Sequence, residues 1–246
     1  TLLHDDVADD SPTRRGRPTV MSLLGGRASV LLGDYWLVKA IDNVLVNKTS
    51  SSEVIKVFSR TLADLAEGEI LQLQKADLGD TAENDYYRII FNKTASLFVT
   101  SAESAAISVS ASAEKMKAVK SYAEYLGIAF QIRDDIFDYE ENPDTGKPVG
   151  LDLKEKKITL PLLGALKNAS EEEAKDIRRK VCRIDEHPEW QKEIVEFVHR
   201  NGGLEYARKR LYEYVERAKL SLRPLGKSED ADKLADIAEF TADRKS

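Results

Sequence analysis

The sequence predicts an all-α protein. Only 7 prolines and 13 glycines occur in 246 residues, and they cluster, so long stretches of chain contain no helix breaker. Within those stretches apolar residues recur at spacings of three and four, which places them on one face of a helix. No segment shows the convincing period-two alternation of a half-buried strand. The chain has no internal repeat and no low-complexity linker, so we expect a single domain.

Seven segments carry the helical pattern. The longest, about 113–139, repeats apolar residues such as Met116, Val119 and Tyr122 along one face. Near position 170 a helix start is predicted by a Ser-x-x-Glu capping box, Ser170 with Glu173. The other six predicted helices cover about 54–70, 89–99, 170–184, 189–201, 204–222 and 230–243.

Two segments are predicted to be loops. Residues 10–19 (DSPTRRGRPT) hold two prolines and a glycine among charged residues, and residues 142–150 (NPDTGKPVG) are equally rich in turn formers. Each loop directly follows a cluster of aspartates at the end of a predicted helix. This coincidence is the strongest functional signal in the sequence.

The composition excludes several classes of protein. Lys and Arg number 37 against 43 Asp and Glu, a net charge of −6, whereas a dedicated nucleic-acid-binding domain normally has a basic surface. Cys182 is the only cysteine, which excludes an internal disulfide and a cysteine zinc site. No apolar run approaches the roughly 20 residues of a membrane-spanning helix. From the cysteine usage we expect a cytoplasmic protein.

Both aspartate clusters have the sequence D-D-x-x-D. Residues i and i+4 of a helix lie one above the other, so the first and third aspartates of each cluster are stacked. The stacked carboxylates repel each other, and they lie near helix C-termini, where the helix dipole disfavours negative charge. The six aspartates are Asp5, Asp6, Asp9, Asp134, Asp135 and Asp138.

A bound cation would explain why carboxylates occupy such positions twice. Oxygen ligands without a nearby His or Cys indicate a hard cation, Mg²⁺ above all, which takes few carboxylates together with substrate phosphates. One D-D-x-x-D in a charged protein is more often a solvated helix face. Two copies, each preceded by apolar residues and followed by a basic loop, favour a metal site.

Basic residues follow each aspartate cluster. Arg14 and Arg15 come shortly after the first cluster, and Lys147 shortly after the second; Lys156 and Lys157 are expected at the start of the next helix. Arginine binds phosphate through two parallel hydrogen bonds, and lysine supplies a mobile point charge. Carboxylates and cations at the mouth of an apolar bundle suit a diphosphate bridged to Mg²⁺.

Four segments resemble signatures of the trans-isoprenyl diphosphate synthases. The family's two aspartate-rich motifs are similar to LLHDDVADDSPTRRGRP and FQIRDDIFDYEENPDTGKPVGLDLKEKK, and further signatures are similar to GDYWLVKA and FNKTASLF. The resemblance covers about two thirds of the chain, as far as Leu163, and is to medium- and long-chain members such as octaprenyl diphosphate synthase. It implies the isoprenoid synthase fold, a helical bundle around a central cavity with the two motifs facing each other, and commonly a homodimer.

The resemblance also implies roles for individual residues. A cluster of three Mg²⁺ ions would be bound mainly by Asp5, Asp9 and Asp134, with support from Asp6, Asp135 and Asp138. The catalytic set would be Asp5, Asp9, Asp134, Lys93 and Lys157. The allylic diphosphate would be held by Arg14, Lys93, Lys147 and Lys157, and isopentenyl diphosphate by Arg15. Near the developing carbocation the site would be lined by Thr94 and Gln131. Lys156 has no clear role, because Lys157 fits the family position better.

The implied activity is head-to-tail condensation of isopentenyl diphosphate with an allylic diphosphate primer. Mg²⁺ and cationic side chains would stabilise the departing diphosphate while the allylic C–O bond ionises, and a dry apolar cavity would protect the carbocation from water. One helical turn before Asp5 the residue is Thr1, not the aromatic plug expected of a short-chain synthase. A medium- or long-chain polyprenyl diphosphate is therefore the expected product.

The sequence begins inside the helix that leads to Asp5. Family members carry upstream helices with a Gly-Gly-Lys-x-x-Arg-type motif for isopentenyl diphosphate, and neither that motif nor a targeting segment occurs in these 246 residues. We therefore expect residues 1–246 to form a synthase domain that lacks its N-terminal helices.

Three alternative functions share part of this pattern. A class I terpene cyclase would typically carry only one aspartate-rich motif, and a head-to-head enzyme such as a squalene synthase fits the RRG and TGKPVG segments poorly. A catalytically silent subunit of a heteromeric synthase usually lacks one of the aspartates, whereas both sets are intact here.

Overall fold

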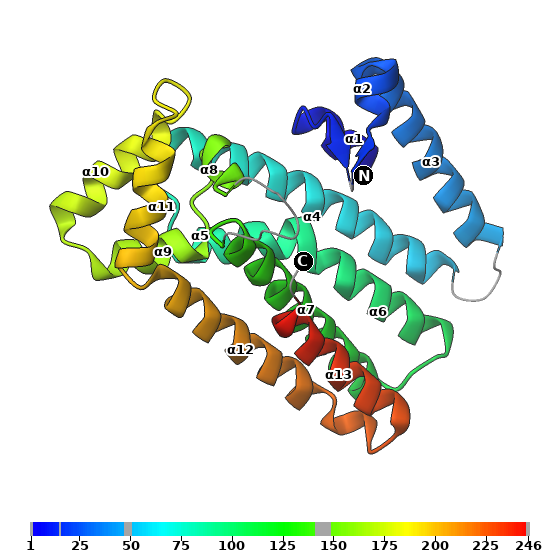
Figure 1. The fold of residues 1–246 in the computed structure, drawn as a ribbon. Coiled ribbons are helices and arrows are strands. Elements are labelled where there is room, and N and C mark those ends of the chain that lie inside the picture. Colours follow the sequence, from blue (N-terminus) through cyan, green and yellow to red (C-terminus); the bar gives the residue numbers. More distant parts are fainter. Residues whose placement is uncertain (1, 15, 47–50, 141–148, 245–246) are drawn as a thin grey trace. The chain divides into compact units, whose positions relative to one another are not determined.

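The computed structural model describes residues 2–14, 16–46, 51–140 and 149–244. Their secondary structure is almost entirely helical (Figure 1), which confirms the all-α prediction. By its internal contacts the chain divides into two compact units, Thr1–Lys56 and Val57–Ser246. The expected single synthase domain over 1–246 stays a prediction. Within the described ranges, no helix combines the length and the apolarity that a bilayer-spanning segment requires.

Besides the start of α4, the described residues of the first unit form three helices and a small hairpin. They are α1 (Leu2–Ala8), β1 (Thr13–Arg14), β2 (Arg17–Pro18), α2 (Val20–Leu24) and α3 (Gly26–Val46). The hairpin corrects the prediction of an irregular loop at 10–19: β1 and β2 pair antiparallel, and Gly16 between them has φ +72°, a conformation that favours glycine. Helix α1 packs on α3, where the Ser29 hydroxyl donates a hydrogen bond to the Leu3 carbonyl at 2.8 Å.

The second unit contains the remaining helices, and α4 begins six residues before it. They are α4 (Ser51–Leu78), α5 (Glu83–Ile90), η1 (Phe91–Ala95), α6 (Ser96–Ser108), α7 (Ala113–Phe137), α8 (Leu151–Lys154), α9 (Leu160–Asn168), α10 (Glu171–Cys182), α11 (Trp190–Arg200), α12 (Gly203–Ser221), η2 (Arg223–Leu225) and α13 (Glu229–Asp243). Ser170 caps α10 by accepting a hydrogen bond from the Glu173 backbone N–H, as predicted.

Two local predictions were wrong. Residues 89–99 are not one regular helix, because the π-helical turn η1 interrupts it between α5 and α6. Lys156 and Lys157 do not start a helix; they lie in the connection between α8 and α9. Lys156 has φ +57°, which ends the short α8, and α9 begins only after its N-cap, Thr159.

Helix α7 is the centre of the second unit. It packs against α6, α9, α12 and α13, and Figure 1 shows α6, α7, α12 and α13 side by side. Ile132 and Ile136 on α7 are fully buried, as are Leu160 on α9 and Leu211 on α12. Burial of such side chains supplies the main favourable free energy of the fold.

Two glycines let neighbouring helices approach η1 closely. A Cβ atom added to Gly127 on α7 would lie 2.5 Å from the Ala95 Cα, and one added to Gly68 on α4 would lie 2.7 Å from the Asn92 Cβ. Side chains larger than hydrogen would separate the helices at both places. The π-helical turn is therefore held between α4 and α7.

Replacing Gly127 with alanine should destabilise the protein. We expect the free energy of unfolding to fall by about 1–3 kcal/mol from overpacking, which outweighs alanine's gain of about 1 kcal/mol in helix propensity. The measurement is urea denaturation followed by circular dichroism. Gly26→Ala is the matched control, because its Cβ would lie 3.5 Å from Val7 Cγ1, an ordinary contact. Equal stabilities for the two variants would contradict the close packing at η1.

Candidate active site

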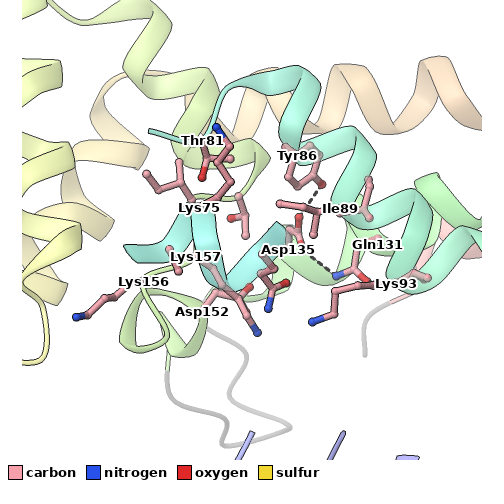
Figure 2. A pocket seen from close by; sticks show the side chains of 16 residues that line it. Lys75, Thr81, Tyr86, Ile89, Lys93, Gln131, Asp135, Asp152, Lys156 and Lys157 are labelled. Atoms are coloured by element: carbon pink, nitrogen blue, oxygen red, sulfur yellow. Dashed lines mark hydrogen bonds and ion pairs between the residues drawn. The ribbon is translucent and has the colours of Figure 1, made fainter. Parts of the chain in front are cut away.

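A pocket of about 200 Å³ opens in the second unit beside the second aspartate motif. Its walls come from α4, the α4–α5 connection, α5, η1, α7, α8 and the α8–α9 connection (Figure 2). The lining combines cationic, amide, hydroxyl and carboxylate groups with apolar residues. The residues that carry these groups include Gln72, Lys75, Thr81, Tyr86, Lys93, Thr94, Gln131, Asp135, Asp152, Lys156, Lys157 and Thr159.

Five of the residues to which the family resemblance gives a role line this pocket. They are Lys93, Thr94, Gln131, Asp135 and Lys157, contributed by η1, α7 and the α8–α9 connection. The structure thus brings together residues that lie up to 64 positions apart in the sequence, from 93 to 157. Their individual roles remain predictions.

The π-helical turn places two of these residues. In η1 the Ser96 backbone N–H reaches the Phe91 carbonyl, and the Ser96 hydroxyl donates to the Asn92 carbonyl at 2.7 Å, so the wider turn keeps its backbone groups satisfied. Lys93 and Thr94 both line the pocket, and Lys93 Nζ lies 2.5 Å from Glu69 Oε2 on α4. π-helical turns are frequent at functional sites.

A chain of hydrogen bonds runs from α5 through α7 to η1. The Tyr86 hydroxyl donates to Asp135 Oδ2 at 2.6 Å, and Gln131 Nε2 donates to Asp135 Oδ1 at 2.9 Å (Figure 2). The Thr94 hydroxyl in turn donates to Gln131 Oε1 at 2.8 Å. Sequence reasoning missed Tyr86, which lies 49 residues from Asp135; no local pattern in the sequence signals this contact.

Asp138 is bonded to the backbone at the start of α8. Its Oδ1 accepts from the Leu151 N–H at 2.8 Å and its Oδ2 from the Asp152 N–H at 3.1 Å. The Gly150 N–H donates to the Asp138 carbonyl at 2.7 Å, and Gly150 has φ +79°. The carboxylate therefore fixes where the chain returns to the pocket, and its support of a metal site stays a prediction.

Carboxylates are crowded on this side of the pocket. Burial, with the Asp152 carboxylate next in importance, raises the pKa of Asp135 to about 8 and that of Asp138 to about 7. Burial also raises the pKa of Asp152, against the opposing effect of Lys157. Sequence reasoning did not single out Asp152, although it lies in the quoted GLDLKEKK segment. The crowding disfavours negative charge, and a cation would relieve it.

The donor set fits a hard divalent cation. All candidate ligands are carboxylate oxygens, the donors that Mg²⁺ prefers. In the described part of the chain, however, no three carboxylate, histidine or cysteine side chains converge on one metal position. A metal bound here would therefore take part of its coordination from a diphosphate or from water, as Mg²⁺ commonly does.

Asp134 pairs with an arginine from the end of α13. Arg244 Nη2 bonds to Asp134 Oδ1 and donates to the Phe130 carbonyl at 3.1 Å. The guanidinium lies 4.1 Å from the centre of the Phe130 ring, and Arg133 donates to the Arg244 carbonyl at 2.8 Å. Since 110 residues separate the paired side chains, the sequence offered no signal for this contact.

The first aspartate motif belongs to the first unit. Asp6 is buried, and its Oδ1 accepts from Arg14 Nε at 2.7 Å. Asp5 and Asp9 are exposed residues on and just after α1. Whether this motif faces the second, as the resemblance implies, stays a prediction, and so does the diphosphate contact of Arg14.

The other basic residues singled out in the sequence are Arg15, Lys147, Lys156 and Lys157. Arg15 and Lys147 lie outside the described residues. Lys157 bonds to Glu155 and lies 3.8 Å from Asp152. Lys156 lines the pocket but pairs with Asp185 at 2.8 Å.

The chain is similar to known proteins over most of its length. The family described as "Polyprenyl synthetase" matches residues 1–198. The chain is 38% identical to an all-trans-nonaprenyl-diphosphate synthase (geranyl-diphosphate specific) of Rhodobacter capsulatus, over 99% of this chain and 74% of that protein. It is 36% identical to the octaprenyl diphosphate synthase of Escherichia coli (strain K12), over 99% of this chain and 75% of that protein.

Solved structures show the same similarity. A decaprenyl diphosphate synthase from Rhodobacter capsulatus has a TM-score of 0.91 and 34% identity, covering 100% of this chain and 75% of that one. A polyprenyl synthase from Caulobacter crescentus CB15, complexed with calcium and isoprenyl diphosphate, has a TM-score of 0.89 and 33% identity, covering 100% and 74%. The predicted isoprenoid synthase fold is confirmed. With four fifths of its length matched by the family, the chain belongs to the polyprenyl synthetases, which are prenyl-transferring enzymes.

Proposed function

We propose that this protein condenses isopentenyl diphosphate with an allylic diphosphate, head to tail and trans, to make a medium- or long-chain polyprenyl diphosphate. The observation that carries the proposal is the pocket in which Lys93 and Lys157 lie with the oxygens of Thr94 and Gln131 beside the second aspartate motif. Relatives named as octaprenyl and nonaprenyl diphosphate synthases support the chain length.

The proposed cofactor is Mg²⁺, as a cluster of three ions. It would be held chiefly by Asp5, Asp9 and Asp134, with the substrate diphosphate completing the coordination. When bound, Mg²⁺ neutralises the negative charge of the leaving diphosphate. The crowded carboxylates of the second unit and the all-oxygen donor set support this assignment.

The side chains of the pocket have distinct proposed tasks. Lys93 and Lys157 bind the diphosphate of the allylic substrate as point charges, and they balance the charge that grows on it as the C–O bond breaks. Thr94 and Gln131 present oxygen atoms to the positive charge left on the allylic carbons. Ile89 and Ile90, both buried on α5 and lining the pocket, keep water from this charge.

We further propose that the protein acts as a homodimer in the cytoplasm. Apolar residues of α3, such as Leu31 and Trp36, are not covered within the unit to which they belong, and exposed apolar surface of this kind commonly marks an interface. The single cysteine supports a reducing compartment.

Replacing the main metal ligand of the second motif should abolish turnover. We expect Asp134→Asn to lower kcat by at least about a hundredfold, because it removes negative charge that would hold the metal and, through the metal, the diphosphate. The assay is Mg²⁺-dependent incorporation of labelled isopentenyl diphosphate into farnesyl diphosphate, with chromatography of the products. Asp176→Asn on α10, an aspartate paired with Lys180 outside the pocket, is the control. A cyclised hydrocarbon as product, or none from the wild-type protein, would refute the proposed condensation.

Stability without metal should fall as the pH rises from about 4 to about 8. Asp135 and Asp138 have a pKa of about 8 and about 7 in the folded protein, against about 3.9 when unfolded. Across that window the folded state holds protons that the unfolded state has lost, so stability declines and levels off above the folded pKa. Melting temperatures measured in a chelator should show this slope.

The same measurement has two controls. Asp135→Asn should reduce the slope, because the amide does not ionise, while Asp138 still contributes. Mg²⁺ with inorganic pyrophosphate should raise the wild-type melting temperature more at pH 8 than at pH 5, since a cation is bound most strongly by ionised carboxylates. An unchanged slope in Asp135→Asn would contradict the raised pKa.

A further inference from the structure

We propose that Asp135 and Tyr86 are positioning residues: they fix the direction of the hydrogen bonds at Gln131 and Thr94, so that both present oxygen lone pairs to the pocket. This role differs from the metal-binding role expected for Asp135 from its motif. The proposal rests on the proposed function, because the oriented oxygens matter for a substrate that becomes positively charged.

The surroundings of Asp135 differ from those of Asp134. Asp135 is 2% exposed, and each of its carboxylate oxygens accepts a hydrogen bond from a side chain, Oδ2 from Tyr86 and Oδ1 from Gln131. The Asp134 side chain is 39% exposed. A metal at Asp135 would have to displace buried donors on both oxygens, whereas Asp134 pairs with Arg244 through Oδ1 at a more exposed position.

When Asp135 is ionised, the direction of the network follows from the chemistry of its members. The Gln131 amide turns its amino group to Asp135 Oδ1, the acceptor it finds at 2.9 Å, so its carbonyl oxygen faces the other way. There it accepts the hydrogen of the Thr94 hydroxyl. A hydroxyl has one hydrogen, so the remaining lone pairs of Thr94 Oγ1 and Gln131 Oε1 are available at the pocket that both residues line.

Tyr86 completes the arrangement from α5. The residue is 3% exposed, so its hydroxyl needs a partner within the protein, and that partner is Asp135 Oδ2. By engaging this oxygen, Tyr86 holds the carboxylate in the rotamer that leaves Oδ1 for Gln131. Electron-rich oxygens stabilise positive charge that exists only after the C–O bond breaks, so the arrangement should affect kcat and leave KM unchanged.

The test separates positioning from metal binding. The variants are Asp135→Asn, Tyr86→Phe and the double variant. Metal affinity is measured as Mn²⁺ binding in the presence of inorganic pyrophosphate, by electron paramagnetic resonance of the free ion. We expect both single variants to bind Mn²⁺ within about twofold of wild type and to lower kcat about two- to fivefold with KM unchanged. Asp134→Asn, by contrast, should lose at least about tenfold in Mn²⁺ affinity.

The double variant tests the direction of the hydrogen bonds. In Asp135→Asn the new amide can still donate to the Tyr86 hydroxyl and accept from Gln131, so the direction is kept. With phenylalanine at position 86, the amide introduced at position 135 can donate its N–H only to Gln131 Oε1. The side-chain amide of Gln131 then flips. We therefore expect kcat of the double variant to fall at least about tenfold below the product of the two single effects.

The control is a different buried tyrosine, Tyr122, which lies on α7. Tyr122→Phe removes a hydroxyl that donates to the Leu234 carbonyl at 2.7 Å, so it has a similar cost in stability without touching the pocket. It should leave kcat unchanged. Loss of Mn²⁺ binding in Asp135→Asn, or kcat values that multiply independently, would overturn the proposal. Absence of condensation by the wild-type protein would instead refute the proposed function, and the Mn²⁺ measurement would still decide whether Asp135 binds metal.

Discussion

Buried carboxyl groups govern the arrangement of the pocket in the second unit. The Asp152 carboxylate lies close enough to Asp135 and Asp138 to disfavour the ionisation of both. Several donors offset this charge: the Tyr86 hydroxyl, the Gln131 side-chain amide, the backbone amides at the start of α8 and the Lys157 ammonium. These donors come from α5, α7, α8 and the α8–α9 connection. The carboxylates therefore hold the pocket's walls together as well as suiting a cation.

Close packing of helix backbones places the polar side chains of η1 near these carboxylates. The hydrogen atoms of Gly68 and Gly127 allow α4 and α7 to approach η1, and the π-helical turn there carries Lys93 and Thr94. Thr94 then lies within hydrogen-bonding distance of Gln131, 37 positions later in the chain. The fold thus contributes to the site through small residues that have no functional group of their own.

Periodicity in the sequence predicted the helical class and most of the long helices of the second unit, since that signal acts within a few residues, but not α3 or α9. The family resemblance named five residues that line the pocket, and their roles stay predictions. Contacts across large separations were not predictable in this way: Asp134 with Arg244, and Asp135 with Tyr86, depend on the packing of whole helices. The π-helical turn was not predicted, because the apolar residues around 89–99 gave no signal of an inserted residue. Lys156 and Lys157 were misplaced because the left-handed backbone at Lys156 is adopted without a glycine.

The π-helical turn makes this protein sensitive to a particular kind of genetic change. Successive residues of an α-helix are rotated by about 100° around its axis, so losing a single codon within 91–95 would let α5 and α6 fuse into one regular helix. Lys93 and Thr94, or whatever replaced them, would then point to a different side. Such a deletion would keep the apolar faces that pack in the bundle but displace the pocket residues of η1. Gene copies that carry it would encode folded but inactive relatives.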